Sequence, residues 1–402
     1  MTFKMTALYA WGANSHGQLG LGFVSEQVLE PMRVEDLPDN LCESSIKDIY
    51  GGGGHTFLLT NQGKLYGAGW NISGQVGNGT QVRAVPNFES IRGLEDHKVV
   101  SVACGWIHSV ALTSRGQVWV WGSNSHSQLG LPTNEVPFSS LPICLDISEA
   151  VSIAAGLRHT VIATKEGRVY SWGQGQKGQL GHLDTEGKMI KTQTTPRVVE
   201  PLEMKVKKVA CGQNTTYAIT NEGEVLAWGD NKWGQLAHDP VNVSFFTCPL
   251  TIPSNYFGGL RAVWMQAGWT HCAVGLSSGQ IYMWGRSDYG QVGPVEEEET
   301  DEASAQISKT PGKLQNSRYR YVPSCLRLDN IRQVVCGSEH NLAVVGTPEK
   351  KKKLMSWGWN EHGNCGTGNT ENVYKPVSLS LEGDLKVIGS GSGHSFALVK
   401  LL

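Results

Sequence analysis

The 402-residue chain carries little charge of either sign: charged residues make up 17% of it and the net charge is −2. A balanced charge excludes a strong field that would attract nucleic acid or an anionic membrane. No stretch reaches the ~18 consecutive apolar residues of a membrane-spanning helix. The first twelve residues also lack the apolar core of a signal peptide. We therefore expect no nucleic-acid partner, no membrane insertion, and a location in the cytoplasm and also the nucleus.

Motifs for covalent chemistry and for metal binding are missing as well. The nine cysteines are odd in number and lack disulfide or metal spacing. Cys104, Cys211 and Cys336 each precede a repeated glycine, where other units have Gly, Ala or Ser, so we interpret them as small, reduced residues. The run Gly51 to Gly54 is not followed by the Gly-Lys-Ser/Thr of a phosphate-binding loop. The sequence predicts no covalent catalysis, no cofactor and no metal.

Glycine is abundant, with 49 residues, and much of it belongs to two phrases that each occur seven times. The first phrase is a Trp-Gly pair followed by a tight turn; its first residues are Trp11, Ala68, Trp121, Trp172, Trp228, Trp284 and Trp357. The second phrase is Gly-x-x-His before an apolar run; its glycines are Gly52, Gly105, Gly156, Gly212, Gly268, Gly337 and Gly391. A fixed repeat of this length, about 57 residues, overrides the domain count that chain length alone suggests.

The spacing between the phrases predicts β-hairpins. The distance from the second phrase to the next Trp-Gly glycine is 17 residues in five of six units, and each interval holds an alternating strand, a turn ending in Gly and a second strand. With two further short strands per unit, the pattern is typical of a β-propeller. We predict an all-β, seven-bladed propeller of four-stranded blades, formed as a single domain by residues 7–399.

The order of the phrases at the two ends predicts how the ring closes. The chain opens on the first phrase and ends on the second, so each end holds half a unit. Strands near 7–22 are expected to complete the blade begun near 386–399. N- and C-terminal strands sharing one blade would leave no open end to the ring.

Two segments depart from the regular spacing. The longest variable interval contains an acidic run at 296–299 followed by basic residues, and predicts a flexible charged insertion over 294–323. Four lysines at 350–353 lengthen the sixth hairpin interval from 17 to 21 residues. We interpret these lysines as a solvated surface run, with a nuclear-import signal as the alternative.

The phrases WGANSHGQLGLG, ACGWIHSVALTSRGQVWVWG and CGSEHNLAVVG resemble the regulator-of-chromosome-condensation repeat family over nearly the whole chain. Other phrases, AGWTH and SWGWNEHG among them, are most similar to a branch of guanine nucleotide exchange factors linked to secretion. The resemblance implies a propeller whose Gly-x-x-His face binds a small GTPase and releases its nucleotide. The family's founding member also binds chromatin through a basic tail, which the six residues before the first strand do not provide.

The resemblance also indicates candidate partner-binding residues. The motif histidines are His55, His108, His159, His271, His340 and His394, with Thr215 in the fourth unit. Between Gly and His, Trp106 and Trp269 are candidate aromatic anchors, and Arg158 is a candidate partner for an acidic region of the GTPase. Glu339 is the one acidic residue in these loops, and it is the candidate to compete for the GTPase lysine or Mg²⁺.

Each candidate has a structural alternative. The histidines would instead bond to the backbone near the axis, and Glu339 would pair locally. Because the repeated tryptophans recur at one place in the unit, we expect them to pack between blades. For function, the alternatives are a monomeric GTPase regulator acting with secretory proteins, a scaffold that binds without exchange, and, third, a chromatin-binding protein.

Overall fold

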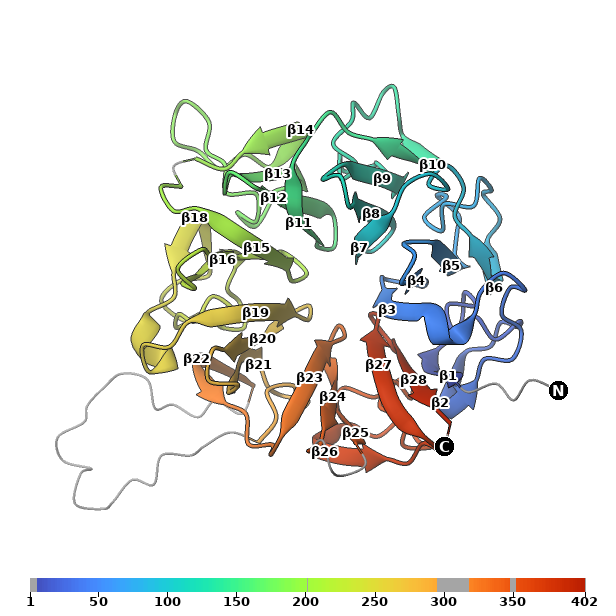
Figure 1. Ribbon diagram of the computed structural model, residues 1–402. Coiled ribbons are helices and arrows are strands. Elements are labelled where there is room, and N and C mark those ends of the chain that lie inside the picture. Colours follow the sequence, from blue (N-terminus) through green and yellow to red (C-terminus); the bar gives the residue numbers. More distant parts are fainter. Residues whose placement is uncertain (1–5, 201, 295–317, 348–351, 402) are drawn as a thin grey trace, which may run out of the picture.

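The computed structural model describes residues 6–200, 202–294, 318–347 and 352–401. In these residues, 28 strands form seven four-stranded antiparallel sheets, arranged as blades around one axis (Figure 1). The predicted seven-bladed propeller is therefore confirmed. Two short 3-10 helices, η1 (Glu43–Ser45) and η2 (Ser254–Phe257), lie between blades.

Blades 1 to 6 each use four consecutive strands, which follow one another from the axis outward. Blade 1 is β3 (Ile46–Gly51), β4 (His55–Thr60), β5 (Leu65–Trp70) and β6 (Ala84–Ser90). Blade 2 is β7 (Val99–Cys104), β8 (His108–Thr113), β9 (Val118–Ser123) and β10 (Phe138–Cys144). Blade 3 is β11 (Ala150–Ala155), β12 (His159–Thr164), β13 (Val169–Gln174) and β14 (Thr192–Val198).

The second half of the ring repeats this order. Blade 4 is β15 (Val206–Cys211), β16 (Thr215–Thr220), β17 (Val225–Asp230) and β18 (Phe245–Thr251). Blade 5 is β19 (Ala262–Ala267), β20 (His271–Leu276), β21 (Ile281–Arg286) and β22 (Tyr319–Cys325). Blade 6 is β23 (Ile331–Cys336), β24 (His340–Val345), β25 (Lys353–Gly358) and β26 (Val373–Leu379).

Blade 7 joins the two ends of the chain, as the offset phrases predict. Its strands are β27 (Asp384–Ser390), β28 (His394–Lys400), β1 (Thr6–Ala13) and β2 (Gln27–Arg33). Strands β1 and β28 pair over seven residues, from Thr6 opposite Lys400 to Gly12 opposite His394. The ring is thus closed by backbone hydrogen bonds between segments from the two ends of the sequence.

The hydrophobic core lies between the blades. The described residues form seven buried clusters, six of which contain one repeated tryptophan. The exception is the junction of blades 7 and 1, where Ala68 takes the tryptophan position. There Phe88, from the outer strand β6, fills the space of the missing indole. Its ring packs against Gly20, on which a Cβ would lie only 2.1 Å from the ring. The equivalent glycine of the next junction, Gly77, packs against the Trp121 indole.

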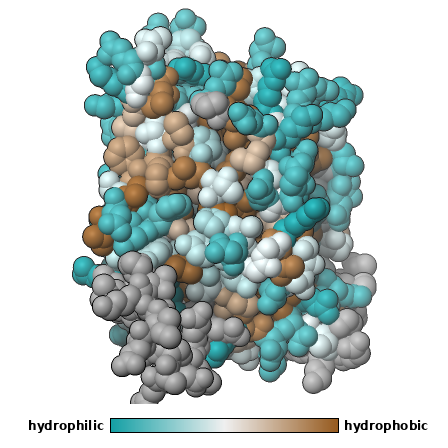
Figure 2. Space-filling view, turned by 90° about the vertical axis from the view of Figure 1, so that its left-hand side faces the viewer, coloured by the Kyte–Doolittle hydropathy of each residue, from teal (hydrophilic) through white to brown (hydrophobic). Residues whose placement is uncertain are grey.

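The irregular segments lie at the rim. Most of the predicted insertion at 294–323 lies outside the described residues, but its end needs correction because Tyr319–Cys325 pairs with β21 as an ordinary outer strand. Of the lysine run, 350 and 351 also lie outside, and Lys353 begins β25. The outer wall over blades 4 and 5 is mostly hydrophilic, with hydrophobic side chains gathered in places (Figure 2). None of the helices in the described part of the chain is long and apolar enough to cross a membrane.

Candidate functional site

The seven Gly-x-x-His loops surround one opening of the central channel. Each loop connects the innermost strand of a blade to the second strand, so all seven lie at the same end of the axis. We call this end the loop face; its loops are 52–54, 105–107, 156–158, 212–214, 268–270, 337–339 and 391–393. The hairpin turns, such as Asn61 to Lys64, lie at the opposite end, the turn face.

Backbone hydrogen bonds join these loops in a closed circle. In each case the N–H of the residue after the glycine donates to a carbonyl of a neighbouring loop, at 2.7 to 3.3 Å. The bonds run from Gly53 to Gly105, Trp106 to Leu157, Leu157 to Gln213, Gln213 to Trp269, Trp269 to Ser338, Ser338 to Ser392, and Ser392 to Gly52. A circle of this kind holds the loop backbones in place and leaves their side chains to vary.

The motif histidines lie beneath the loop face and link each blade to the next. They are at most 1% exposed, and each Nε2 lies 2.8 to 3.1 Å from a side-chain oxygen of the following blade. The pairs are His55 with Ser109, His108 with Thr160, His159 with Thr216, His271 with Asn341, His340 with Ser395, and His394 with Thr56.

The partner group fixes the protonation of each histidine. Ser109, for example, donates its own proton to the Gln75 carbonyl at 2.9 Å, so its oxygen accepts from His55 Nε2–H. Nδ1 of His55 then has no hydrogen-bond partner among the described residues. A second proton would have to reside on that buried nitrogen, and burial lowers the pKa of His55 to about 3.

The histidines therefore need a correction as candidate partner contacts. Because they are buried, they present no surface to a partner, and their role in this structure is to join blades. The alternative of a backbone bond is also corrected, since the acceptor is a side chain. The sequence carries a signal for this link. In every blade that receives a histidine bond from the preceding blade, the residue directly after the motif histidine or threonine is Ser, Thr or Asn.

The junction of blades 4 and 5 lacks the histidine link. Thr215 replaces the histidine, and its hydroxyl donates to its own blade at the Asp230 carbonyl. The acceptor position of the next blade is Cys272. Here the two blades are joined by the Cys272 thiol, which donates to the Tyr217 hydroxyl of blade 4 at 2.7 Å, while that hydroxyl donates to the Gln235 carbonyl of its own blade at 2.9 Å. Tyrosine thus takes over the role that histidine has elsewhere.

The repeated tryptophans bond to the same turn carbonyls. The set Trp11, Trp121, Trp172, Trp228, Trp284 and Trp357 is fully buried. In five of the six, the indole N–H donates at 2.8 to 3.1 Å to the turn of the preceding blade. Trp121 and Ser109, for example, share the Gln75 carbonyl. These tryptophans are placed for packing between blades.

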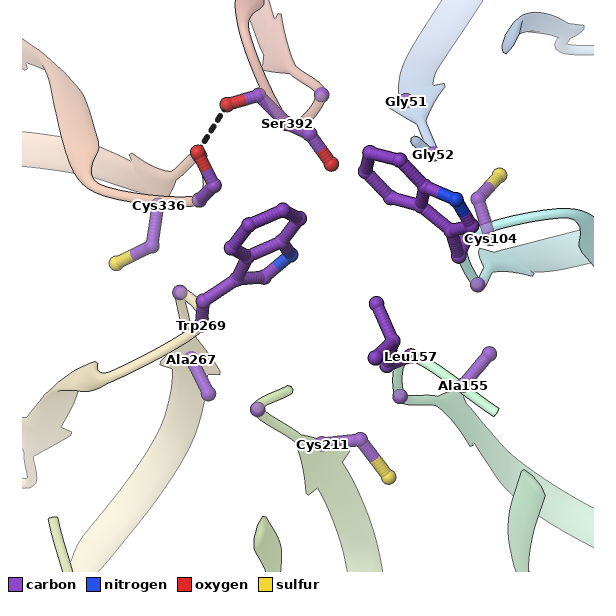
Figure 3. Close-up of a pocket in the computed structure, with 18 of the residues that line it drawn as sticks. Gly51, Gly52, Cys104, Ala155, Leu157, Cys211, Ala267, Trp269, Cys336 and Ser392 are labelled. Atoms are coloured by element: carbon purple, nitrogen blue, oxygen red, sulfur yellow. Dashed lines mark hydrogen bonds between the residues drawn. The ribbon is translucent and has the colours of Figure 1, made fainter. Parts of the chain in front are cut away.

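Two other tryptophans are positioned differently. Trp106 and Trp269 are half-buried, come from blades 2 and 5, and meet at the axis with ring centroids 5.4 Å apart. They line a cavity of about 90 Å³ together with Leu157 and Ser392. Figure 3 shows Trp269 and Leu157 projecting into the centre of the ring, inside a circle of small residues. The centre of the loop face is therefore apolar and aromatic.

Glu339 requires the second correction, because its carboxylate is internal. The residue is 6% exposed. Its carboxylate accepts hydrogen bonds from the Thr270 hydroxyl at 2.6 Å and the Gln291 amide at 2.8 Å. Burial raises the pKa of Glu339 to about 7, against the effect of these two donors. As placed, the group pairs locally and does not reach a partner's lysine or Mg²⁺.

A cluster next to Glu339 was not expected from the sequence. The Arg286 guanidinium is 3.9 Å from Glu339, donates two hydrogen bonds to Asp288, and stacks on the rings of Trp233 and Tyr289. Both rings are half-buried. One signal for this cluster was present in the sequence. The residue two positions before the buried glutamine, or its equivalent, of each tight turn is Trp or Tyr in blades 4 and 5, whereas the other blades have His, Ser or Lys there.

Arg158 is the charged loop residue that remains accessible. It is half-buried next to Leu157, and no acceptor or carboxylate among the described residues pairs with its guanidinium. Its charge and the burial of His126 together lower the pKa of that histidine, with burial the larger cause. The loop face thus offers an unpaired cation beside the aromatic centre.

The central channel also opens at the turn face. From the turn face it forms a cavity of about 650 Å³, lined by the innermost strands. Within the described ranges, no three His, Cys, Asp or Glu side chains are grouped so that they could hold a metal ion.

The comparison with known sequences identifies this class of propeller. The pattern of the RCC1-like domain matches residues 7–397, and the chain belongs to that family. It is 39% identical to the secretion-regulating guanine nucleotide exchange factor of Bos taurus over 98% of this chain and 83% of the relative. The protein of the same name from Mus musculus is 36% identical over 98% and 84%.

A solved structure agrees in fold. Prp20p from Saccharomyces cerevisiae superposes with a TM-score of 0.81 at 25% identity, covering 100% of this chain and 93% of Prp20p. Prp20p itself binds to Gsp1p and to histones.

Proposed function

We propose that this protein is a guanine nucleotide exchange factor for a small GTPase, linked to protein secretion and located in the cytoplasm and nucleus. Support comes from relatives named as exchange factors over nearly the whole chain. Exchange needs no covalent step, because a surface that binds the nucleotide-free GTPase more tightly than the loaded form shifts the equilibrium towards release.

The observation that carries the proposal is the half-buried tryptophan pair at the axis. The six repeated tryptophans are buried between blades, whereas Trp106 and Trp269 lie at the centre of the loop face, at a loop position where the other five units have Gly, Leu, Gln, Ser and Ser. Tryptophan and arginine are enriched among the residues that dominate binding at protein interfaces. Trp106, Trp269 and Arg158 therefore form the proposed centre of the docking surface.

The second candidate function is a scaffold that binds a GTPase without releasing its nucleotide. The burial of Glu339 favours this alternative, because it withdraws the carboxylate that was the candidate to displace Mg²⁺ or the phosphate-binding lysine. Chromatin binding remains the third candidate, and a gel shift at low salt that shows no retardation would remove it.

The test is release of fluorescent GDP from a panel of purified small GTPases. We expect one GTPase to release GDP faster with the wild-type protein and to lose that acceleration with Trp269→Ala. The matched control is Trp119→Ala, which removes a half-buried tryptophan near the turn end of blade 2. Binding to one GTPase without acceleration would establish the scaffold, and no binding to any of them would refute both candidates.

A further inference from the structure

At two junctions the second variable residue of the Gly-x-x-His loop supplies the acceptor for a buried glutamine of the preceding blade. At the junction of blades 5 and 6, Gln291 Oε1 accepts the Tyr289 N–H and its Nε2 donates to Glu339. At the junction of blades 3 and 4, Gln179 Nε2 donates in the same way to Asn214, at 3.3 Å. Glu339 and Asn214 occupy the same position of the repeat.

Arg158 occupies this position at the junction of blades 2 and 3. The corresponding glutamine, Gln128, is fully buried and accepts the His126 N–H through Oε1 at 2.7 Å. Its Nε2 has no acceptor among the described residues. Arginine has donors only, so it cannot supply one. The Gln128 amide therefore lacks an acceptor at the junction where arginine takes the repeat position that Glu339 has three blades away.

Arginine distinguishes this junction from the other one with an unpartnered amide. Gln75 Nε2 also lacks an acceptor among the described residues, and there the loop residue is Ile107, which has no charge to attract a ligand. A buried amide without an acceptor is unfavourable, and a guanidinium is suited to bind a carboxylate through two parallel hydrogen bonds. The junction of blades 2 and 3 thus combines a buried amide without an acceptor and a guanidinium, and a bound anion would stabilise both groups.

The surroundings also favour an acidic ligand. Three carboxylates of the loop-face side already have polar or charged neighbours. Glu339 accepts from Thr270 and Gln291, and Asp288 accepts from Arg286. Burial raises the pKa of Asp230, against the effect of the nearby Lys177 and Lys232. Arg158 is left unpaired beside Leu157 and the axial cavity.

We propose that Arg158 and Gln128 form a carboxylate-binding site for an acidic segment of the partner protein, which places an apolar side chain beside Leu157, Trp106 and Trp269. The proposal rests on the loop face being the docking surface. It adds that recognition depends on one acidic residue adjacent to an apolar one. The internal Glu339 shows how this scaffold receives a carboxylate at the equivalent position.

The substitution Arg158→Glu has opposite effects on binding and stability. It places a carboxylate where the Gln128 amide can donate, as Gln291 does to Glu339, so we expect the melting temperature to rise by about 1–2 °C. It also repels an acidic ligand, so we expect affinity to fall at least about tenfold. Arg158→Gln, which removes the charge only, should weaken binding less. A protein that binds poorly because it is misfolded would melt lower.

Selection of peptides tests the site without knowledge of the natural partner. Random heptapeptides displayed on phage are selected on the full-length protein, and the enriched peptides are synthesised and their affinities measured by fluorescence anisotropy. We expect enriched peptides to combine Asp or Glu with Leu, Phe or Trp, and to lose binding to Arg158→Glu. The control Lys208→Glu makes the same charge change beside the turn-face cavity and should bind like wild type.

Three results would overturn the proposal: no enrichment of acidic peptides, equal binding to the wild type and Arg158→Glu, or equal losses with Arg158→Glu and Lys208→Glu. These outcomes are independent of nucleotide release. Failure of the GDP assay would reject the proposed function and leave the acidic site standing, whereas failure of the peptide test would leave exchange activity open.

Discussion

The buried histidines predict that this propeller unfolds in mild acid. His55, His108, His159, His340 and His394 have pKa values lowered to about 3 by burial, and His271 to about 4. In the unfolded chain each would titrate near 6.5. Between these values the unfolded state binds more protons than the folded state, so the free energy of unfolding falls as the pH falls.

The size of this destabilisation follows from the difference between the pH and the pKa of histidine in the unfolded chain. At pH 5 each histidine is about 1.5 pH units below its unfolded pKa, and one unit corresponds to about 1.4 kcal/mol, so each costs about 2 kcal/mol. Six histidines together cost about 12 kcal/mol, which is comparable to the 5–15 kcal/mol stability of typical domains. Glu339 acts in the opposite direction, because its raised pKa adds stability below pH 7, but it is one group against six.

Urea denaturation at several pH values measures this effect, with tryptophan fluorescence and circular dichroism as probes. We expect the free energy of unfolding to decrease steeply between pH 6.5 and pH 5, and the folded state to be lost well above pH 4. The slope of the unfolding free energy against pH gives the number of protons taken up on unfolding. Replacing one histidine, as in His159→Gln, should lower that number by about one. An unfolding free energy that is equal at pH 7.5 and pH 5 would refute the reasoning, as would resonances of the six motif histidines that titrate near 6.5 in the folded protein.

The packing leads to three further expectations. Tyr217→Phe removes the hydroxyl that replaces a histidine link, and should cost about 1–2 kcal/mol in urea denaturation; unchanged stability would mean that the junction is held by packing alone. Glu339→Ala leaves the Thr270 and Gln291 donors buried without an acceptor, and should cost about 2–4 kcal/mol by the same assay, whereas a loss below the error of the assay would contradict the assigned bonds. Removing residues 1–22 deletes β1 and leaves one edge of β28 unpaired, so we expect no folded monomer by gel filtration and circular dichroism; a monomer with unchanged melting would contradict the closure.

The architecture was predictable because the repeat marks every unit. Constant 17-residue spacing located the hairpin of each blade, and the offset of the two phrases predicted the shared blade 7. The end of the insertion was misplaced because Arg320 was grouped with the basic residues of the preceding segment, although Tyr319, Tyr321 and Val322 are residues typical of a strand. The strand itself is defined by its pairing with β21.

The candidate site was predictable in position but not in exposure. The motif placed Glu339 and Arg158 in loops around one opening, which the structure shows, whereas His159 begins strand β12 beneath that opening. Whether a loop side chain points outward or inward depends on the neighbouring blade: Glu339 turns inward because Thr270 and Gln291 offer donors. Arg158 finds no acceptor and stays half-exposed. The two donors to Glu339 are 69 and 48 residues away in sequence, too far for a local pattern to connect them.

The central claim is that the loop face is the docking surface. The most direct test is capture of a nucleotide-free small GTPase by immobilised protein, with one variant on each face: Trp106→Lys on the loop face and Arg332→Glu beside the turn-face cavity. We expect Trp106→Lys to abolish capture and Arg332→Glu to capture the GTPase as well as the wild type does. Loss of capture with Arg332→Glu, and undiminished capture with Trp106→Lys, would contradict it.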